Sequence, residues 1–445
     1  MDFLNMAQLL EEKKYLKLKD ELKDGQSFDI AEFIDSLDER QALLAFRLLP
    51  KGVAADVFSY LSVDRQAEIS DLVNEKELAD ILSDLYFDDK VDLLEEMPAN
   101  VIKKILKHTS DVERKLINQF LMYPDDSAGS LMTIEFVDLK KEMTVSDALD
   151  RIRRHAPNRE TIYTCYVMDE ARHLEGTISL KDLVLCDVDT KISEVMQVEP
   201  IFVKTHDNQE YIADVFKNYD LIAAPVVDNE QRLVGIITID DIVDVMEKEA
   251  TEDFHRMAAI EPFDDSYLNT SILVLARKRI GWLLVLMISA TLTGLILSRY
   301  ELALESVVAL TFFIPMLMDT GGNAGSQAST LVIRSITLGE VKFKDIFRVI
   351  SKELGVSLIV GLALSAVNFL RIWLIQGYDL TITLTVTITL FFTVLMAKVI
   401  GGILPILADK VNLDPAIMAS PLITTIVDTF SLIIYFSVAT IFLNI

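Results

Sequence analysis

One acidic residue in the last apolar stretch of the chain could bind a cation. Asp428 lies about 14 residues into a stretch that runs from 415 to 443. That is ~21 Å along a helix, too deep for its short side chain to reach bulk water. A carboxylate at this depth is costly unless it faces protein, water or a cation. The sequence therefore predicts a cation site at Asp428; the alternative is a protonated or hydrogen-bonded packing residue.

A glycine-rich run in an earlier apolar stretch could contribute neutral oxygen atoms to the same kind of site. It extends from Pro315 to Gln327, and it contains no basic residue, which argues against a phosphate-binding loop. Small residues let helices approach closely, and a broken backbone can expose carbonyl oxygens to a water-filled path. The pairs Gly321-Gly322 and Gly401-Gly402 mark the points at which two long spans could tilt, bend or break.

Acidic residues are also dense outside the apolar stretches. Like charges at helical spacing repel one another, and a divalent cation bound among them would relieve that repulsion. The alternative is an acidic, solvated helix surface without a ligand. The residues concerned are Asp88 and Asp89 in a helical region, Asp220, Asp240 and Asp241 further along, and Asp244, Glu247, Glu249, Glu252 and Asp253 on one expected helix.

Five apolar stretches after Arg279 are each long enough to cross a bilayer as a helix. A helix needs about 20 apolar residues to span ~30 Å of hydrocarbon. Basic residues concentrate before the first stretch, between the second and third, and between the fourth and fifth. We expect the chain to lie in the inner or plasma membrane of the cell. The distribution of basic residues predicts that its N-terminal part is in the cytoplasm and its C-terminus outside. The stretches are 280–298, 303–335, 354–375, 380–407 and 415–443.

Charge divides the chain into two contrasting parts. Residues 1–270 hold 58 acidic and 30 basic residues, whereas residues 271–445 hold 10 and 12. An acidic surface argues against nucleic acid as a partner, because nucleic acid needs a basic surface. The two cysteines give neither a disulfide framework nor a zinc pattern. No nucleophile and base are placed together, so the chain is not expected to be an enzyme.

The acidic part divides further by its periodicity. Residues 1–132 show helical spacing and near-repeats, which predict an all-α superhelix. Two α/β units of about 60 residues follow at 133–199 and 200–250, because 166–183 matches 225–242 at a fixed offset of 59. Each unit has the pattern strand, Asp-containing turn, strand and helix start, which looks like a tandem pair of CBS domains. A connecting helix at 251–270, starting near 246, then leads to five spans in 271–445.

Four motifs in this order resemble the MgtE family of Mg²⁺ channels over nearly the whole chain. They are 123–132 (YPDDSAGSLM), 247–253 (EKEATED), 321–327 (GGNAGSQ), and Asp414-Pro415-Ala416 with Pro421 and Asp428. The resemblance implies a homodimer in the lipid bilayer, with one pore on the two-fold axis lined mainly by the second and fifth spans. The helix from about 246 to 268 would be the family's plug helix.

The resemblance also assigns roles to individual residues. Asp428 would be the pore carboxylate that meets Mg²⁺. Pore-lining candidates are Pro315, Gly321, Gly322, Asn323, Gly325, Gln327, Thr424 and Thr425. The regulatory Mg²⁺ ligands would be Asp88, Asp89, Glu210, Asp220, Asp241, Asp244, Glu249 and Glu252. Some relatives bind ATP in the CBS pair, but here no phosphate-binding glycine loop is present, and Leu221 stands where an aromatic side chain could have stacked on the base.

Together these features predict a Mg²⁺ channel or transporter for Mg²⁺ uptake, gated by cytosolic Mg²⁺. The main alternative is a carrier for Co²⁺, Ni²⁺ or Mn²⁺. The candidate ligands are all oxygen atoms, and the spans contain no His or Cys. Both features favour a hard ion such as Mg²⁺ over the softer Co²⁺, Ni²⁺ and Mn²⁺. A second alternative is a membrane sensor that acts on a partner protein, although a sensor does not need a carboxylate at the depth of Asp428.

Overall fold

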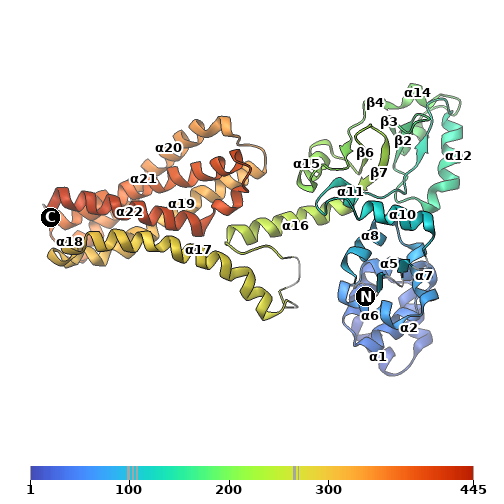
Figure 1. Ribbon diagram of the computed structural model, residues 1–445, viewed down its shortest axis with the longest axis horizontal. Coiled ribbons are helices and arrows are strands. Elements are labelled where there is room, and N and C mark those ends of the chain that lie inside the picture. The colour runs from blue at the N-terminus through green and yellow to red at the C-terminus, as the bar shows by residue number, and fades with distance from the viewer. Residues whose placement is uncertain are drawn as a thin grey trace. The chain divides into compact units, whose positions relative to one another are not determined.

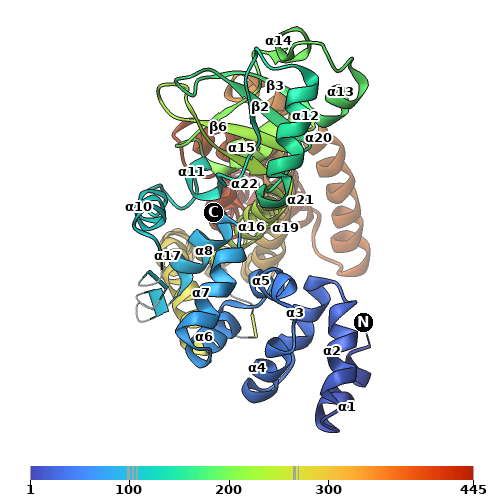
Figure 2. The same cartoon turned by 90° about the vertical axis from the view of Figure 1, so that its right-hand side faces the viewer.

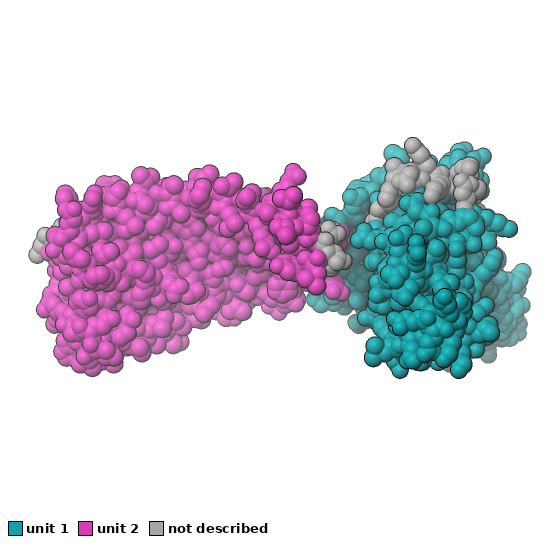
Figure 3. Space-filling model, turned by 90° about the horizontal axis from the view of Figure 1, so that it is seen from below, with its two compact units in different colours: residues 1–246 teal, residues 247–445 magenta. Residues whose placement is uncertain are grey.

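The computed structural model describes residues 2–97, 101–102, 105–106, 109–263, 267–268 and 270–443. It divides into two compact units, residues 1–246 and residues 247–445 (Figure 3). Each unit has its own buried core, and each is described separately below.

The first unit begins with short helices that stack on one another, most of them nine or ten residues long and the last, α11, only four. Helices two apart in sequence contact each other, as α3 does α5 and α5 does α7, which gives a superhelix (Figures 1 and 2). Periodic apolar residues such as Phe33 and Phe58 fill its core. The helices are α1 (Phe3–Glu11), α2 (Tyr15–Lys23), α3 (Ser27–Asp35), α4 (Glu39–Arg47), α5 (Lys51–Ser59), α6 (Val63–Leu72), α7 (Glu75–Asp84), α8 (Phe87–Glu96), α10 (Asp111–Phe120) and α11 (Ala128–Leu131).

Two small sheets follow, and their registers repeat at the offset that the sequence predicts. Tyr166 pairs with Thr177 in one antiparallel hairpin, and Pro225 pairs with Ile236 in the other. The first repeat contains β1 (Asp138–Leu139), α12 (Val145–His155), the 3₁₀ helix η1 (Ala156–Asn158), β2 (Thr164–Met168), β3 (Leu174–Ser179), α13 (Leu180–Leu185), α14 (Ile192–Val195) and β4 (Gln197–Val198). The second contains β5 (Val203–Lys204), α15 (Gln209–Tyr219), β6 (Ala223–Val227) and β7 (Leu233–Thr238).

The helix after the second repeat, α16 (Ile239–Met257), differs from the expected one at both ends. It starts directly after β7. It ends at Met257, eleven residues before the predicted end at Leu268. Ala259 has a φ of 54°, and the Ile260 N–H donates to the His255 carbonyl over 2.9 Å. This bonding closes the helix as a Schellman motif. Part of the expected helix, 264–266 and 269, lies outside the described residues.

The second unit is built from long apolar helices. Among the described residues, four segments are long and apolar enough to cross a membrane: Ile272–Arg299, Phe343–Ile375, Leu380–Lys410 and Ser420–Leu443. A further helix, α19 (Ile314–Thr337), is long enough but more polar, and it occupies the second predicted span. The elements are α17 (Ile272–Arg299), α18 (Glu301–Ser306), η2 (Val308–Phe313), α19, η3 (Phe343–Asp345), α20 (Ile346–Leu370), η4 (Arg371–Ile375), α21 (Leu380–Lys410), η5 (Pro415–Met418) and α22 (Ser420–Leu443).

The glycine pairs do not break their helices, which corrects that part of the expectation for these two spans. Both α19 and α21 continue through them, so the backbone carbonyls at these positions stay within helices. The glycines instead allow close packing. A Cβ on Gly401 would lie 2.2 Å from the Gly325 carbonyl oxygen, and one on Gly322 would lie 2.7 Å from the Thr424 side chain. The second span is interrupted earlier, where η2 precedes α19.

Candidate cation sites

Asp428 lies inside the last helix of the second unit. Because η5 precedes it, α22 begins only at Ser420, so Asp428 is eight residues or ~12 Å into the helix rather than the ~21 Å expected from the sequence. Its side chain is half-buried in the single chain. Thr424 and Thr425, one turn earlier, each donate a hydroxyl hydrogen bond to the Pro421 carbonyl, at 2.9 and 3.0 Å.

One face of α19 is polar and exposed although the helix belongs to the apolar unit. Pro315, Asp319, Asn323 and Gln327 recur every four residues, so they form one stripe, and all four are exposed. The predicted pore residues Gly321, Gly322 and Gly325 lie on other faces and are buried in helix packing. A stripe with a carboxylate and two amides would be very costly against lipid. We therefore expect it to face water or a second protein surface.

The packing of α19 against α22 places Asp319 level with Asp428. A Cβ on Gly322 would meet Thr424, and the Ser326 hydroxyl donates to that of Ser420 over 3.0 Å. Residue numbers rise along α19 as they fall along α22, so the two helices run antiparallel. Asp319 is three residues before Gly322 on α19, so on the antiparallel α22 it lies opposite a position about three residues after Thr424, at residues 427–428.

The first unit brings several acidic residues together around the start of α8. Asp88 and Asp89 occupy the first turn of that helix, and Asp241 occupies the first turn of α16. Asp88 is only 9% exposed, and its buried Oδ1 atom has no hydrogen-bond partner among the described residues. The Thr238 hydroxyl donates to Asp241 over 2.8 Å. Two predicted regulatory positions from different domains therefore meet in one acid cluster, which also includes Glu135, Glu160 and Asp240.

Burial and mutual repulsion shift the ionisation of this cluster. Burial, and next the charge of Asp241, raises the pKa of Asp88 well above its ordinary value. Burial and Asp240 raise the pKa of Asp89 to about 6. Burial also raises the pKa of Asp241 to about 6, against the opposing effect of Thr238. Burial and the charges of Asp240 and Asp241 raise the pKa of Glu160 to about 8. These carboxylates would gain stability from a nearby cation.

The cluster fits Mg²⁺ in its chemistry but is not a closed cage. Its donors are hard carboxylate oxygens. Within the described part of the chain, one buried oxygen of Asp88 and one of Glu160 have no hydrogen-bond partner. Over the part of the chain that the structure describes, no three His, Cys, Asp or Glu side chains converge as metal ligands. Mg²⁺ keeps several water molecules when it binds proteins. The arrangement therefore suits an ion held partly through its hydration shell.

The raised pKa values predict that the acid cluster loses stability as pH rises in the absence of Mg²⁺. The folded pKa of Glu160 is about 8, against 4.5 ordinarily. The contribution of Glu160 to the stability of the folded state is therefore complete below about pH 4.5, and it is lost as pH rises through about 8. In the full protein with EDTA, we expect hydrogen exchange of α8, corrected for the intrinsic rate, to show less protection at about pH 8 than at about pH 5.5.

Two variants check that this pH dependence comes from the cluster. Glu160→Gln should flatten the upper part of the dependence, whereas Glu170→Gln, an exposed acid of the first repeat, should leave it unchanged. Adding Mg²⁺ should restore protection at high pH. Protection of α8 that stays constant across the whole range in EDTA would contradict this account.

Three further predicted regulatory acids lie on α15 and α16. Glu210 is exposed in the first turn of α15, and Asp220 closes the same helix in a left-handed conformation with φ 52°. Asp244 is on an exposed face of α16. None of the three is among the charges named as leading causes of the raised pKa values of Asp88, Asp89 and Asp241. Their assignment as Mg²⁺ ligands stays a prediction.

The end of α16 that belongs to the second unit is docked against the helices that carry the candidate pore residues. Arg256 pairs with both Asp414 and Glu252. Asp414 also accepts the Ala416 N–H over 2.7 Å, which caps η5. Met257 packs against an apolar cluster of Ile333 on α19, Ala416 in η5 and Ala419 just before α22. A change in this end of α16 would therefore reach both helices.

Acids on this same end of α16 repel one another. Burial, followed by the charges of Asp414 and Glu249, raises the pKa of Asp253 to about 6. Glu252 adds to the repulsion, and Arg256 offsets part of it. The predicted ligands Glu249 and Glu252 thus belong to a second acidic group, within the second unit.

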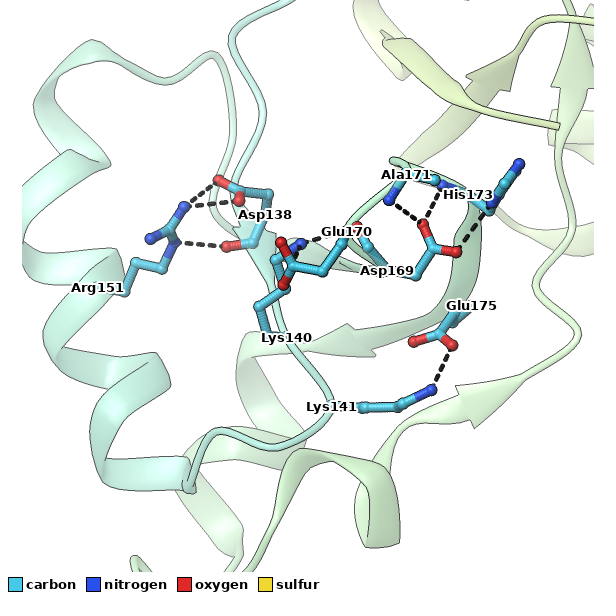
Figure 4. Close-up of polar contacts among 9 residues, drawn as sticks. All are labelled: Asp138, Lys140, Lys141, Arg151, Asp169, Glu170, Ala171, His173 and Glu175. Carbon is cyan, nitrogen blue, oxygen red and sulfur yellow. Dashed lines mark hydrogen bonds and ion pairs between the residues drawn. The ribbon is translucent and has the colours of Figure 1, made fainter. Parts of the chain in front are cut away.

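The first CBS-like repeat shows what an acidic surface looks like when its charges are satisfied. Arg151 holds both carboxylate oxygens of Asp138 at 2.6 Å, and Lys141 holds Glu175 at 2.6 Å (Figure 4). In the adjacent turn, the His173 ring lies 2.9 Å from Asp169. Each of these acids has a protein cation or a ring nitrogen beside it. In the cluster around Asp88, by comparison, Oδ1 of Asp88 and Oε2 of Glu160 have no hydrogen-bond partner among the described residues, which favours that cluster as a cation site.

Three acidic residues at these sites, Asp319, Glu135 and Glu160, were not identified from the sequence. Asp319 stood in the glycine-rich run, and a second acid in an apolar stretch was a signal that could have been used. Glu160 gave no such signal, because it follows Arg159 in a connection and resembles an ordinary surface charge. Only the fold brings it to α8.

Family models match most of the chain in a consistent order. The model described as the MgtE intracellular N domain matches residues 26–126. The CBS domain model matches residues 128–188 and 192–248. The MgtE model, described as a divalent cation transporter, matches residues 314–438.

Curated proteins and solved structures give the same picture. The magnesium transporter MgtE of Thermus thermophilus is 37% identical over 99% of this chain and 98% of its own length. That of Bacillus subtilis is 34% identical over 95% and 96%. A crystal structure of the cytosolic domain of the Mg²⁺ channel MgtE in complex with ATP is 36% identical, with a TM-score of 0.52, and covers 55% of this chain and 99% of that one.

Proposed function

Because the chain belongs to the MgtE family of magnesium transporters and is a multi-pass membrane protein, we propose that it takes up Mg²⁺ through a pore lined by α19 and α22. The observation that carries this proposal is the exposed polar stripe of α19 beside Asp428. A lipid-facing helix would not place a carboxylate and two amides on one face. Water and a cation provide the surroundings that such a stripe needs.

A second copy of the chain supplies the other wall of the pore. One copy leaves the stripe open, and a two-fold axis beside it would enclose it between two α19 helices. The protein is then a homodimer with Asp428 of each copy facing the axis. The basic residues of the connections place the N-terminal unit in the cytoplasm and the chain end outside. The last residue, Ile445, lies outside the described residues.

Mg²⁺ passes this pore in hydrated form. The ion prefers octahedral oxygen coordination and gives up its water slowly, so a dry cage would hold it too long for rapid conduction. Carboxylates around an aqueous path attract the ion through its waters. Close packing at Gly322, Gly325 and Gly401 fixes the spacing of α19, α21 and α22, which supports selection by size.

Cytosolic Mg²⁺ gates the channel through the acids of the first unit and of α16. Repulsion among Asp88, Asp89 and Asp241 is relieved when Mg²⁺ binds, which favours the state in which these acids lie close together. The docking of Met257 and Arg256 against α19 and η5 gives α16 direct contact with the pore helices. ATP is a further candidate ligand of the CBS pair, because the relative's cytosolic domain was solved with it.

Ion flux into liposomes that hold the purified protein tests the transport proposal. We expect uptake of Mg²⁺, reported by an internal Mg²⁺-sensitive dye, with weak competition from Ca²⁺ because Ca²⁺ differs in size and hydration. Protein-free liposomes are the control. Uptake of Mn²⁺, Co²⁺ or Ni²⁺ in preference to Mg²⁺ would favour the alternative carrier. An intact protein that moves none of these ions would contradict the proposal.

A further inference from the structure

Asp319 is an acidic residue that the family assignment leaves without a role. It is exposed on α19, in the middle of the polar stripe formed with Pro315, Asn323 and Gln327. The contacts of Gly322 with Thr424 and of Ser326 with Ser420 set it level with Asp428 on the antiparallel neighbour α22. Among the described residues of α19 and α22, these two are the only acids. The chain therefore presents two carboxylates at one level of the candidate pore.

We propose that Asp319 is a second ion-binding carboxylate of the conduction path, and that with Asp428 it selects divalent over monovalent cations. The inference rests on the proposed function, because it needs the pore that Asp428 defines. It adds a residue to that site and gives it a separate task. In the homodimer, the level of the pore at which Asp319 and Asp428 lie would hold four carboxylates instead of two.

The physical argument is one of charge. Two carboxylates that repel each other across neighbouring helices are stable only with a compensating positive charge or in abundant water. A divalent ion compensates two charges at once, whereas a monovalent ion leaves the pair half-compensated. The interaction of a hydrated divalent ion with four carboxylates is also stronger than with two, in a medium less polar than bulk water. The second acid thus favours occupancy by Mg²⁺ over Na⁺ or K⁺.

The position of Asp319 on its helix supports contact with the hydrated ion through its water molecules. Its neighbours along the stripe, Asn323 and Gln327, carry amide oxygens that can accept hydrogen bonds from the waters of the ion. On the other faces of α19, Gly321, Gly322 and Gly325 pack against α21 and α22. This packing holds the stripe at a fixed distance from Asp428. The ion's hydration shell would then be bound from two helices of each copy.

The test compares Asp319→Asn with Asp319→Glu and with Glu340→Gln in the full protein in liposomes. Glu340 is an exposed acid of the same unit after the end of α19, so it controls for loss of one charge. We expect Asp319→Asn to raise the Mg²⁺ concentration for half-maximal uptake by about tenfold, which corresponds to ~1.4 kcal/mol of weaker binding. It should also admit Na⁺ or K⁺, measured as a shift in reversal potential under mixed-ion conditions.

Two further measurements separate ion binding from a structural role. Hexaamminecobalt(III), a non-exchanging mimic of hydrated Mg²⁺, should block Asp319→Asn about tenfold less tightly than the unaltered protein. Asp319→Glu should restore block and selectivity, which a packing defect would not allow. Size-exclusion chromatography must show the same assembly for all variants. Unchanged half-saturation, block and selectivity in a correctly assembled Asp319→Asn would overturn the proposal.

The outcome for Asp428 distinguishes failure here from failure of the proposed function. If Asp428→Asn abolishes uptake while Asp319→Asn behaves like the unaltered protein, the pore stands and the role of Asp319 is refuted. If neither change affects uptake, both the pore assignment and this inference are refuted.

Discussion

Replacing Asp428 with asparagine should reduce Mg²⁺ uptake by about 100-fold or more while leaving the protein folded and assembled. The amide has nearly the same size and stays polar, so the packing of α22 should be kept. What disappears is the negative charge that attracts the ion into a path of low polarity. Charge-assisted hydrogen bonds to the waters of a cation are about twice as strong as neutral ones. Losing one from each copy is sufficient for an effect of this size.

The measurement is dye-reported Mg²⁺ uptake into liposomes, with the quantity of inserted protein determined for each variant. Thr429→Val is the matched control, because it changes the next residue of α22 and removes only a hydroxyl that donates to the Thr425 carbonyl over 3.1 Å. The control should transport Mg²⁺ at nearly the normal rate. Asp428→Ala should be as inactive as Asp428→Asn, since both lack the charge. Normal uptake by either Asp428 variant would contradict the pore assignment.

Much of the fold was predictable because its signals are local. The 59-residue offset predicted two equivalent hairpins, and the structure pairs Tyr166 with Thr177 and Pro225 with Ile236 at that offset. Apolar length predicted the membrane spans. The glycine pairs, in contrast, allowed two outcomes, a bend or a close contact between helices. Only tertiary packing decides between them, and it places Gly401 against the Gly325 carbonyl.

The candidate sites were less predictable because their residues are brought together from distant segments. Asp88 and Asp241 could each be named from acid density, but their proximity depends on how the helical domain packs against the second repeat. Glu160 joins them from a connection without any distinctive spacing. Asp319 could have been found, since an acid four residues from Asn323 on an expected span is unusual.

The second large effect concerns gating. Neutralising Asp241, Asp244, Glu249 and Glu252 together, as asparagine or glutamine, should leave the channel open at cytosolic Mg²⁺ concentrations that close the unaltered protein. Closure is stabilised only by the preference of Mg²⁺ for the closed state. Without these ligands that preference is lost, and millimolar Mg²⁺ has little to bind. Moving a two-state equilibrium from 1:99 to 99:1 takes about 5.5 kcal/mol, which several weak sites supply together.

Patch recording with controlled Mg²⁺ on the cytoplasmic side measures open probability directly. The matched control neutralises four exposed acids of the first repeat, Glu170, Asp187, Asp189 and Glu194, and therefore removes the same charge. If charge alone set the equilibrium, the two quadruple variants would behave alike. If bound Mg²⁺ sets it, only the first variant should stay open, and the control should close at nearly the normal Mg²⁺ concentration.

The same experiment separates two forces that act in the unaltered protein. The acids repel one another, which favours opening, and they bind Mg²⁺, which favours closure. Neutralisation removes both forces together. The open probability of the variant therefore depends only on the remaining interactions, which include the contacts of Met257 and Arg256. An open variant means that those contacts alone do not hold the pore shut and that closure depends on the ion. A variant that still closes at high Mg²⁺ would refute gating through these acids.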